Sequence, residues 1–250
     1  MHNREREQEI LNILKTRGGF VTVRQFCQAL FASESSIRRD LQALEEQGLV
    51  KRSYGGASLC GSYSTIVTFN HRTRQNIAAK REIAKKAAAL VRDGDLVFLD
   101  QSSTAFYLAE ELTKLGSITV VTNNIEILML MSGSGLKVMA SGGFLSEENR
   151  NCLMGGDAQR TFETVYADWM FFSVKALSRD GIVADCSREE INVRHAMLRN
   201  AENKVLLCDS SKFGLRAPYR QCSLQEVDYL ISEGNCAREF ADVSPNICLL

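Results

Sequence analysis

Hydroxyl and lysine side chains at two places in the chain could bind a phosphate group. Three hydroxyl residues follow the apolar run 96–99 and open a predicted helix: Ser102, Ser103 and Thr104. Backbone N–H groups and the helix dipole favour an anion at such a position, and the hydroxyls add hydrogen-bond donors. Lys212, in a polar segment after the apolar run 205–208, could supply a compensating positive charge. These residues predict a binding site for a small phosphorylated metabolite.

Further polar residues that suit such a site follow other apolar runs. Polar clusters and helical segments alternate with five short apolar runs, at 96–99, 118–121, 136–140, 169–174 and 205–208. This alternation predicts a largely parallel sheet flanked by helices, which binds its ligands at the carboxyl ends of the strands. Asp100 and Glu189 could accept hydrogen bonds from sugar hydroxyls there. The other loop residues expected at this edge are Asn123, Gly142 and Gly143.

Each of these residues also fits a purely structural role. The hydroxyls at 102–104 could only cap the helix, and Asn123 could only form an Asx-turn. The two glycines could be a plain turn. Asp209 and Lys212 could pair on the surface with little effect on stability. The residue types by themselves support both interpretations.

A second group of residues, near the N-terminus, is suited to contacts with DNA. Ile37, Leu41 and Leu44 recur at helical spacing and form one apolar stripe on a helix that Ser33 caps. Short polar and basic side chains lie opposite this stripe or on its flanks: Ser35, Ser36, Arg38, Arg39 and Gln42. Arginine binds guanine with two hydrogen bonds and serine adapts to several acceptors, so this face fits the major groove.

Two more helices and a β-ribbon are predicted to position this face. A helix over 4–17 comes first, and a short helix follows a capping box that begins at Thr22. Residues 49–57 then form two short strands with a glycine turn, which is typical of a wing. Lys51 and Arg52 on this ribbon would contact phosphates and add affinity that is independent of base sequence.

The alternative is a three-helix packing module that does not bind DNA. In such a module Arg38 and Arg39 would form surface ion pairs with acidic residues of the same helix, namely Asp40, Glu45 or Glu46. Helical periodicity fits this alternative as well as it fits DNA binding. The order of the motif residues favours DNA binding.

That order resembles the signature of DeoR-type repressors. The matching segments are Arg6-x-x-x-Ile10, Ser33-x-x-Ser36-Ile37-Arg38-Arg39-Asp40-Leu41-x-x-Leu44-x-x-x-Gly48 and Lys51-Arg52-x-Tyr54-Gly55-Gly56-Ala57. The resemblance implies that Tyr54 joins the DNA-binding surface. One departure is Ser36, where the family usually has threonine. The hydroxyl is kept, so DNA binding need not change, while the operator sequence can differ.

The resemblance covers nearly the whole chain. Its other segments are Lys80-Arg81-x-Ile83-Ala84, Gly94-Asp95, Leu99-Asp100-x-x-Ser103-Thr104, Val121-Thr122-Asn123, Gly142-Gly143, Glu189, Met197 and Asp209-Ser210-Ser211-Lys212-Phe213-Gly214. These segments imply a sensor domain similar in fold to ribose-5-phosphate isomerases and CoA transferases. They also imply a sugar-phosphate effector and a homodimer or homotetramer. The implied function is repression of a carbohydrate operon, and binding of the ligand relieves this repression.

Two departures from the family concern the effector site. Ser102 stands where a glycine is expected, so it can reshape the phosphate loop if that glycine has a positive φ. Lys175 stands in a segment where the family tends to be rich in glycine, so it either adds a cation to the pocket or faces elsewhere. The first departure leaves the identity of the effector open.

Length and composition fit two domains. With 250 residues, 45% of them hydrophobic, the chain can bury one small and one larger core. We predict a winged helix-turn-helix DNA-binding domain over 1–58, a linker over 59–75, and an α/β effector-binding domain over 76–250. The first helix of the α/β domain carries four basic residues that we expect on a solvated face: Lys80, Arg81, Lys85 and Lys86.

Charge, cysteines and apolar runs argue against several classes of protein. Lys+Arg and Asp+Glu are both 30, so a nucleic-acid contact must be local. The eight cysteines include no C-x-x-C pair, which predicts reduced thiols and argues against a disulfide framework or a zinc site. We expect no cofactor. The N-terminus lacks the apolar core of a signal peptide, and the longest apolar run is far shorter than the roughly 20 residues of a membrane span. We expect a cytoplasmic protein without membrane contact.

Two other functions are compatible with the sequence. The α/β domain could be an isomerase-like enzyme in which Asp100, Glu189 and Lys212 transfer protons. Alternatively, the α/β domain of a DNA-binding protein could serve only for oligomerisation. An attached DNA-binding module makes turnover unnecessary, which favours a regulator over an enzyme.

Overall fold

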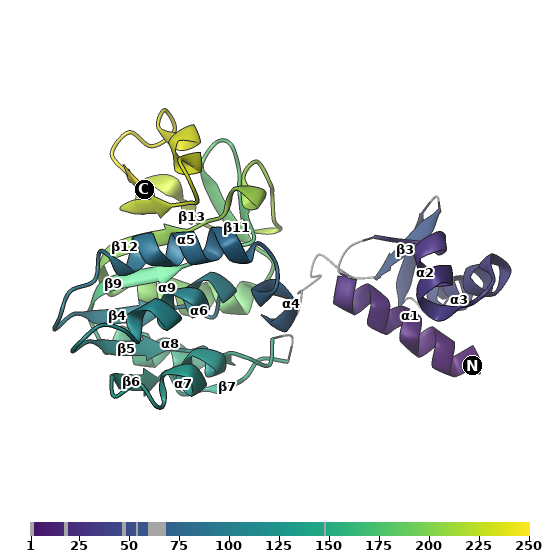
Figure 1. The fold of residues 1–250 in the computed structure, drawn as a ribbon, viewed down its shortest axis with the longest axis horizontal. Helices are drawn as coiled ribbons and strands as arrows, with labels where there is room; N and C mark the ends of the chain where they lie inside the picture. The colour runs from purple at the N-terminus through teal and green to yellow at the C-terminus, as the bar shows by residue number, and fades with distance from the viewer. Residues whose placement is uncertain (1–2, 18–19, 47–48, 54, 60–68, 148) are drawn as a thin grey trace. The chain divides into compact units, whose positions relative to one another are not determined.

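The computed structural model describes residues 3–17, 20–46, 49–53, 55–59, 69–147 and 149–250, which form two compact units (Figure 1). Unit 1 is Met1–His71 and unit 2 is Arg72–Leu250. Their boundary falls within the segment 59–75 that we predict as a linker. The described part of that segment includes the short helix α4 (Phe69–Thr73), which the lack of sequence periodicity did not predict.

Unit 1 is a three-helix domain with a small antiparallel sheet. Its elements are α1 (Asn3–Arg17), β1 (Val21–Thr22), α2 (Val23–Leu30), α3 (Glu34–Glu46), β2 (Val50–Ser53) and β3 (Gly56–Leu59), with strand order β1-β3-β2. The capping box at Thr22 is confirmed, because its side chain accepts from Gln25 N–H while the Gln25 side chain accepts from Thr22 N–H. β2 and β3 form the predicted wing.

The core of unit 1 contains the predicted stripe. Ile37, Leu41 and Leu44 are at most 1% exposed and pack with Phe26 and Ile10 of the other two helices. Fully burying a side chain of this size stabilises a fold by about 1.5–3 kcal/mol. This packing fixes the rotation of α3 about its axis, so the residues between the stripe positions face outward.

Unit 2 is built on one parallel sheet of seven strands. They are β4 (Leu96–Leu99), β5 (Thr119–Thr122), β6 (Lys137–Ala140), β9 (Ala167–Phe172), β12 (Ala201–Leu207), β14 (Tyr229–Ile231) and β15 (Cys248–Leu249). Their order is β15-β14-β12-β9-β4-β5-β6, and every neighbouring pair is parallel. The predicted parallel sheet is confirmed, with β14 and β15 added to the five expected strands.

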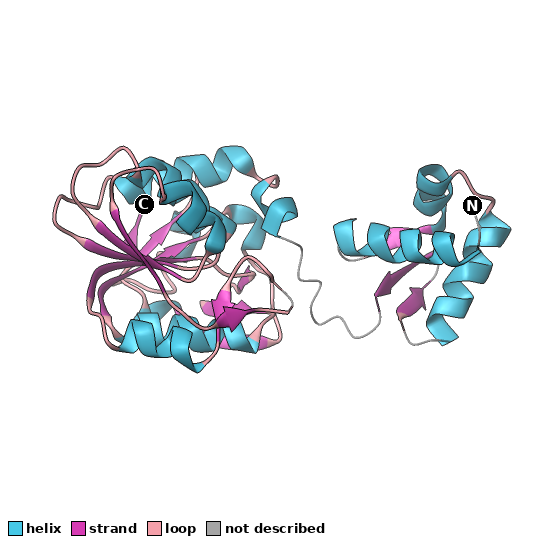
Figure 2. Ribbon diagram, turned by 90° about the horizontal axis from the view of Figure 1, so that it is seen from below, coloured by secondary structure: helices cyan, strands magenta, loops and turns pink. Residues whose placement is uncertain are grey.

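Helices cover both faces of this sheet (Figure 2). One layer is α5 (Ile77–Ala88), α6 (Ser103–Leu112) and α7 (Ile125–Met131), and the other is α8 (Gly156–Glu163) and α9 (Arg188–Arg199). Successive residues of β4 face opposite layers. Phe98 packs with Phe162 and Met197 in one core, while Leu99 packs with Leu108 in the other. Strands buried on both faces are continuously apolar, which is why the sequence shows runs rather than alternation.

Several short elements accompany the large sheet. They are β7 (Phe144–Leu145), β8 (Leu153–Met154), β10 (Ala176–Leu177), β11 (Ile182–Asp185) and β13 (Tyr219–Ser223), with the 3-10 helices η1 (Ser210–Lys212), η2 (Leu224–Glu226) and η3 (Cys236–Phe240). β10, β11 and β13 form an antiparallel sheet, and β7 pairs with β8. The sequence pattern did not predict these elements.

The strand order indicates where a ligand would bind. From β4 the chain runs outward through β5 to β6, then returns to β9 on the other side of β4 and continues through β12 to β15. In open α/β sheets, ligands bind outside the carboxyl ends of the strands at such a reversal. The carboxyl ends of β4 and β9 are therefore where a site is expected. Within the described residues, no helix combines the length and apolarity needed to cross a membrane.

Candidate effector site and DNA-binding face

Asp100 joins the ends of the two strands at which the sheet order reverses. It follows β4 and is fully buried. Its Oδ2 accepts a hydrogen bond from the N–H of Ser173, which follows β9, at 3.3 Å. Its Oδ1 accepts one from the N–H of Ser102 at 3.0 Å. Asp100 thus connects β4, β9 and the start of α6.

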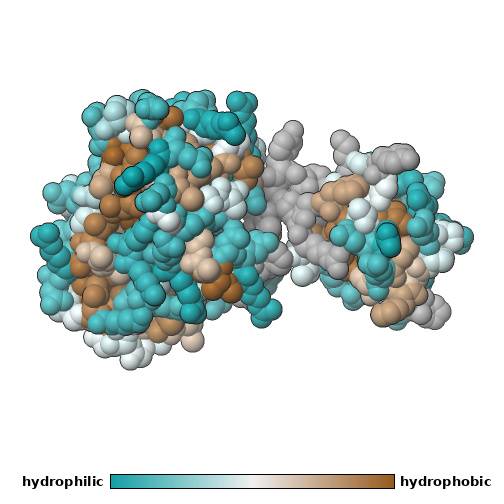
Figure 3. Space-filling model, turned by 45° about the horizontal axis from the view of Figure 1, so that its top comes forward, coloured by the Kyte–Doolittle hydropathy of each residue, from teal (hydrophilic) through white to brown (hydrophobic). Residues whose placement is uncertain are grey.

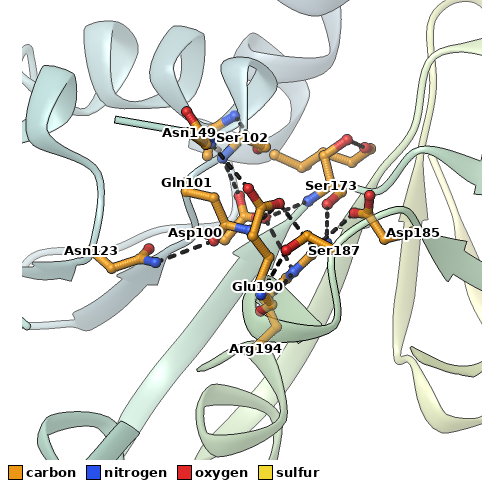
Figure 4. A network of polar contacts seen from close by, with 12 residues as sticks. Asp100, Gln101, Ser102, Asn123, Asn149, Ser173, Asp185, Ser187, Glu190 and Arg194 are labelled. Atoms are coloured by element: carbon orange, nitrogen blue, oxygen red, sulfur yellow. Dashed lines mark hydrogen bonds and ion pairs between the residues drawn. The ribbon is translucent and has the colours of Figure 1, made fainter. Parts of the chain in front are cut away.

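A buried arginine of α9, Arg194, lies beside Asp100 (Figure 4). Its guanidinium is 2.7 Å from Asp185 Oδ2, 3.6 Å from Glu190 Oε2 and 4.0 Å from Asp100 Oδ2. It also donates to the carbonyl oxygen of Ser173 at 2.7 Å. Burial works to lower the pKa of Arg194, but the three carboxylates raise it above its ordinary value. Burial raises the pKa of Asp100, and the charge of Arg194 offsets only part of that shift.

Side-chain amides extend this network towards β5 (Figure 4). Asn123 donates from Nδ2 to Gln101 Oε1 at 3.3 Å, and Gln101 donates from Nε2 to Glu190 Oε2 at 3.0 Å. Asn149 donates to the other carboxylate oxygen of Glu190 at 3.0 Å. The Asx-turn that the sequence alternative gives to Asn123 does not form, because Asn123 Oδ1 has no hydrogen-bond partner within the described residues. Asn124 caps α7, with its Oδ1 accepting from the N–H groups of Glu126 and Ile127. Asn123 is therefore part of the network.

The three hydroxyl residues of the predicted phosphate loop have different surroundings. Ser102 caps α6, because its Oγ accepts a hydrogen bond from the N–H of Ala105 at 3.1 Å. Ser103 and Thr104 are buried in the first turn. Among the described residues, Thr104 Oγ1 and Asn123 Oδ1 are buried atoms without a hydrogen-bond partner. Buried polar atoms are seldom left unpaired, so these two atoms mark positions where a ligand or water can bind.

Lys212, the last residue of η1, reaches the same network. Its Nζ donates to Ser173 Oγ at 2.7 Å and lies 3.4 Å from Asp209 Oδ2. Asp209 is 1% exposed, so the two residues do not form the surface pair of the sequence alternative. Burial works to raise the pKa of Asp209, but Lys212 and neighbouring hydrogen bonds lower it below its ordinary value. Through Ser173 and Asp100, hydrogen bonds link Lys212 to the N-terminus of α6.

The prediction that Lys80 lies on a solvated face is wrong. Lys80 is 4% exposed, and its Nζ donates to the carbonyl oxygen of Arg72. Burial lowers the pKa of Lys80 to about 8, with a further decrease from the charge of Lys212 and an opposing effect from Asp209. A second cation thus lies near Lys212. The sequence pattern missed it because a charged residue next to an apolar stripe is ordinarily assigned to solvent.

Besides Ser103 and Thr104, whose side chains make no hydrogen bond to the network in the described part of the chain, four predicted effector residues do not join it. Glu189 and Lys175 are exposed, and neither side chain forms a hydrogen bond or ion pair within the described residues. Gly142 and Gly143 both have positive φ, and a Cβ at Gly143 would lie 2.2 Å from the carbonyl oxygen of Met154. The turn between β6 and β7 therefore accounts for both glycines.

The predicted DNA-binding face of α3 is exposed in unit 1. Ser35, Arg39 and Gln42 are exposed on the side away from the apolar stripe. Ser33 Oγ accepts a hydrogen bond from the N–H of Ser36 at 3.3 Å, so Ser33 acts as the predicted cap of α3. The first turn of α3 therefore presents hydroxyls, and the next turn an arginine, as contact with base edges requires.

The ion pairs of α3 differ from those of the packing alternative. Asp40 is buried and binds Arg6 of α1, with Arg6 Nη2 donating to Asp40 Oδ1 at 3.0 Å. Arg38 pairs with Glu34 at 3.4 Å across an exposed helix turn. Among the described residues, Arg39 forms no ion pair. Its charge is thus available to a partner outside the chain.

The wing is attached to α3 through Glu45. Glu45 Oε1 accepts a hydrogen bond from the N–H of Arg52 at 2.8 Å, and Glu45 Oε2 lies 3.8 Å from the Arg52 guanidinium. Arg52 is exposed on β2. Lys51 is also in β2, but its side chain lies outside what the structure describes, as does the whole of Tyr54. The predictions for those two side chains stay predictions.

Sequence reasoning missed several residues of the network, chiefly Arg194 and Glu190. The apolar periodicity of α9 could have identified them, because Ile191, Val193 and Met197 are buried. Their helical phase puts Glu190 and Arg194, four residues apart, on the inward side. Applying this periodicity would have favoured Glu190 over its neighbour at 189.

Comparisons with known proteins cover nearly the whole chain. Residues 6–63 match the family described as DeoR-like helix-turn-helix domain, and residues 75–234 match the DeoR C terminal sensor domain. The HTH-type transcriptional repressor GlcR of Bacillus subtilis (strain 168) is 32% identical over 244 residues, covering 97% of this chain and 93% of that protein. The lactose phosphotransferase system repressor of Lactococcus lactis subsp. lactis is 31% identical over 216 residues, covering 85% of this chain and 84% of that protein.

One solved structure with a partial likeness is an isomerase. The ribose 5-phosphate isomerase A of Methanocaldococcus jannaschii aligns with 54% of this chain and 53% of its own, at 19% sequence identity and a TM-score of 0.40. The matched portion is about half of each chain.

Proposed function

The chain belongs to the DeoR family of HTH-type transcriptional regulators, and on this premise we propose that it represses a carbohydrate operon under the control of a phosphorylated sugar. Unit 1 binds operator DNA through α3 and the wing. Unit 2 binds the effector at the carboxyl ends of β4, β5, β9 and β12. One of the relatives is named a lactose phosphotransferase system repressor, which supports a sugar-related operon.

One observation carries the effector proposal. Asp100 with Ser102, Asn123 and Lys212 come from three separate segments, yet hydrogen bonds connect them into a single network at the sheet reversal. The N-terminus of α6 and Lys212 suit a phosphate, because one offers backbone N–H groups and the other a positive charge. The unpaired oxygen atoms of Thr104 and Asn123 suit hydroxyl groups of a sugar.

A thermal-shift screen tests this site. We expect one of ribose 5-phosphate, glucose 6-phosphate or fructose 6-phosphate to stabilise unit 2, while inorganic phosphate and the parent sugars have little effect. Saturation at 100 times Kd contributes about 2.7 kcal/mol, a rise in Tm of about 5–10 °C for a domain of this size. Lys212→Met should lose most of this shift because it removes the charge that neutralises the phosphate.

The matched control is Lys175→Met, which removes the same charge from an exposed position without contacts to the network. It should keep the full shift. A shift that survives Lys212→Met but is lost in Lys175→Met would place the phosphate elsewhere. Absence of a shift with every phosphorylated sugar would instead favour the alternative in which the α/β unit serves only for oligomerisation.

We propose that the effector is bound without being converted. The regulator names of both relatives support this view, and Glu189, one of the three groups suggested for proton transfer, is exposed and, among the described residues, makes no side-chain contact with the network. Incubation with the stabilising sugar phosphate should leave it unchanged, as chromatography of the sugar can establish. Steady turnover would favour the isomerase-like alternative.

We also propose that the working form is a homodimer or homotetramer in the cytoplasm. Large apolar side chains are exposed on unit 2, among them Met129, Phe144 and Leu145 at 68%, 60% and 51%. Figure 3 shows apolar areas that interrupt a mostly hydrophilic surface. Exposed apolar areas commonly mark interfaces between proteins, which supports an assembly of several copies.

A further inference from the structure

The segment 72–76 is the first part of unit 2, and it continues α4 into α5. Any change in unit 2 that reaches unit 1 along the chain must pass through it. Side chains of unit 2 hold this segment at three points. Tyr107 Oη donates to the carbonyl oxygen of Thr73 at 2.7 Å, and Lys80 Nζ donates to that of Arg72. Asn76 is held through its side chain.

Asn76 binds the loop that carries Lys212. Its Nδ2 donates to Asp209 Oδ1 at 2.9 Å and to Ser211 Oγ at 2.9 Å. Ser211 Oγ donates in turn to Asp209 Oδ1. Lys212 Nζ lies 3.4 Å from the other carboxylate oxygen of Asp209. Asp209 is therefore shared between Asn76 and the lysine that we assign to the effector phosphate.

The backbone of Asn76 is unusual for the position it occupies. It stands at the N-cap of α5 with φ 50° and ψ 39°, in the left-handed region, and its side chain makes no capping hydrogen bond. An N-cap asparagine normally accepts a bond from the helix, which contributes about 1 kcal/mol. Here the side chain gives up that bond and the backbone adopts a sparsely populated conformation. Both features place the amide on the loop that carries Lys212.

A phosphate at the candidate site changes the electrostatic balance of this loop. Lys212 would shift its charge from Asp209 to the phosphate, and the phosphate would add negative charge near Asp209. Asp209 and Ser211 would then reorient together with Lys212, because Asp209 is the N-cap of η1 and Ser211 and Lys212 lie within its three residues. The contacts of Asn76 depend on where those two side chains point.

We propose that Asn76 is the positioning residue that couples effector binding at Lys212 to the segment leading into the DNA-binding unit. In the free protein, the bonds from Asn76 hold segment 72–76 against the loop of η1. Effector binding reorients the loop and releases Asn76 from it, while the bonds from Tyr107 and Lys80 to the segment remain. The inference rests on the proposed function, since it names how that effector site is regulated.

Asn76→Gly tests this coupling. Glycine adopts a positive φ without strain, so the variant keeps the backbone and removes only the amide. Affinity for a duplex selected from a random pool by the wild-type protein is measured by anisotropy, with and without the sugar phosphate that gives the largest thermal shift. Effector-induced changes in affinity typically reach about 5–150-fold. We expect such a change in the wild type and less than about 2-fold in Asn76→Gly, with the thermal shift retained.

Gln75→Gly is the matched control. It adds the same backbone freedom one residue earlier, in an exposed position, and keeps the amide of Asn76. This variant should respond to the effector like the wild type. Equal responses of Asn76→Gly and the wild type would overturn the inference, as would loss of response in Gln75→Gly, which would point to chain flexibility. If the wild type shows neither thermal shift nor release, the proposed function fails, and the coupling fails with it.

Discussion

Replacing Arg194 by methionine should cost unit 2 about 3–5 kcal/mol of unfolding free energy, the usual cost of removing one partner from a buried ion pair. Methionine fills much of the same volume but leaves Asp185, Glu190 and Asp100 without their shared cation. It also leaves the carbonyl oxygen of Ser173 without its donor. Buried carboxylates that lose their counter-charge are strongly destabilising.

Urea unfolding followed by tryptophan fluorescence measures this loss. Trp169 is the single tryptophan of the chain and lies in β9, so its signal reports on unit 2. The control is Arg199→Met on the same helix, whose pair with Glu163 at 3.1 Å is largely exposed. That change should cost less than about 1 kcal/mol. Similar small losses in both variants would show that the buried network contributes little to stability.

Arg39→Ala should lower affinity for the selected operator duplex by about 5–150-fold, which corresponds to the roughly 1–3 kcal/mol of a two-bond contact from arginine to guanine. The reason is the exposed position of Arg39 on α3 and the lack of an ion pair within the described residues. The substitution should change the unfolding free energy of unit 1 only slightly, because it leaves the apolar stripe of α3 intact. Anisotropy titrations with the operator duplex and a scrambled duplex, each at two salt concentrations, give the affinities.

These titrations distinguish a contact between Arg39 and the bases from a sequence-independent attraction between its positive charge and the DNA. Loss of a base contact lowers affinity for the operator far more than for the scrambled duplex. Arg199→Ala removes the same charge from unit 2 and should change neither affinity by more than about 2-fold if Arg39 acts through local contact. Equal affinity of Arg39→Ala and the wild type for the operator would remove Arg39 from the recognition surface.

The fold could be predicted where apolar residues recur along several turns or fill a whole strand. The stripe of α3 and the five apolar runs met this condition, so the winged helix and the parallel sheet followed from the sequence. β14, β15 and the small antiparallel sheet did not follow. They contain two to five residues each, and their pairing partners are distant along the chain, as for β11 and β13. So few residues show no clear period.

The candidate site could be predicted where a residue directly follows a strand. Asp100 and Asn123 came from this rule, because the carboxyl ends of parallel strands share one edge. The same rule did not identify the buried charged residues. The charge of Asp209, which lies far along the chain, opposes the effect of burial on the pKa of Lys80, and Arg194 pairs with Asp185 of another element. Sequence patterns assign such charges to solvent, since the partner that makes burial tolerable is visible only in the fold.

Release of operator DNA by a sugar phosphate tests the central claim most directly. The wild-type protein is bound to its selected duplex, and the stabilising sugar phosphate is titrated while anisotropy is recorded. We expect affinity for the duplex to change by about 5–150-fold, with the parent sugar inactive and Lys212→Met bound to DNA but unresponsive. Unchanged affinity of the wild type at saturating concentrations of every sugar phosphate would contradict regulation by such an effector.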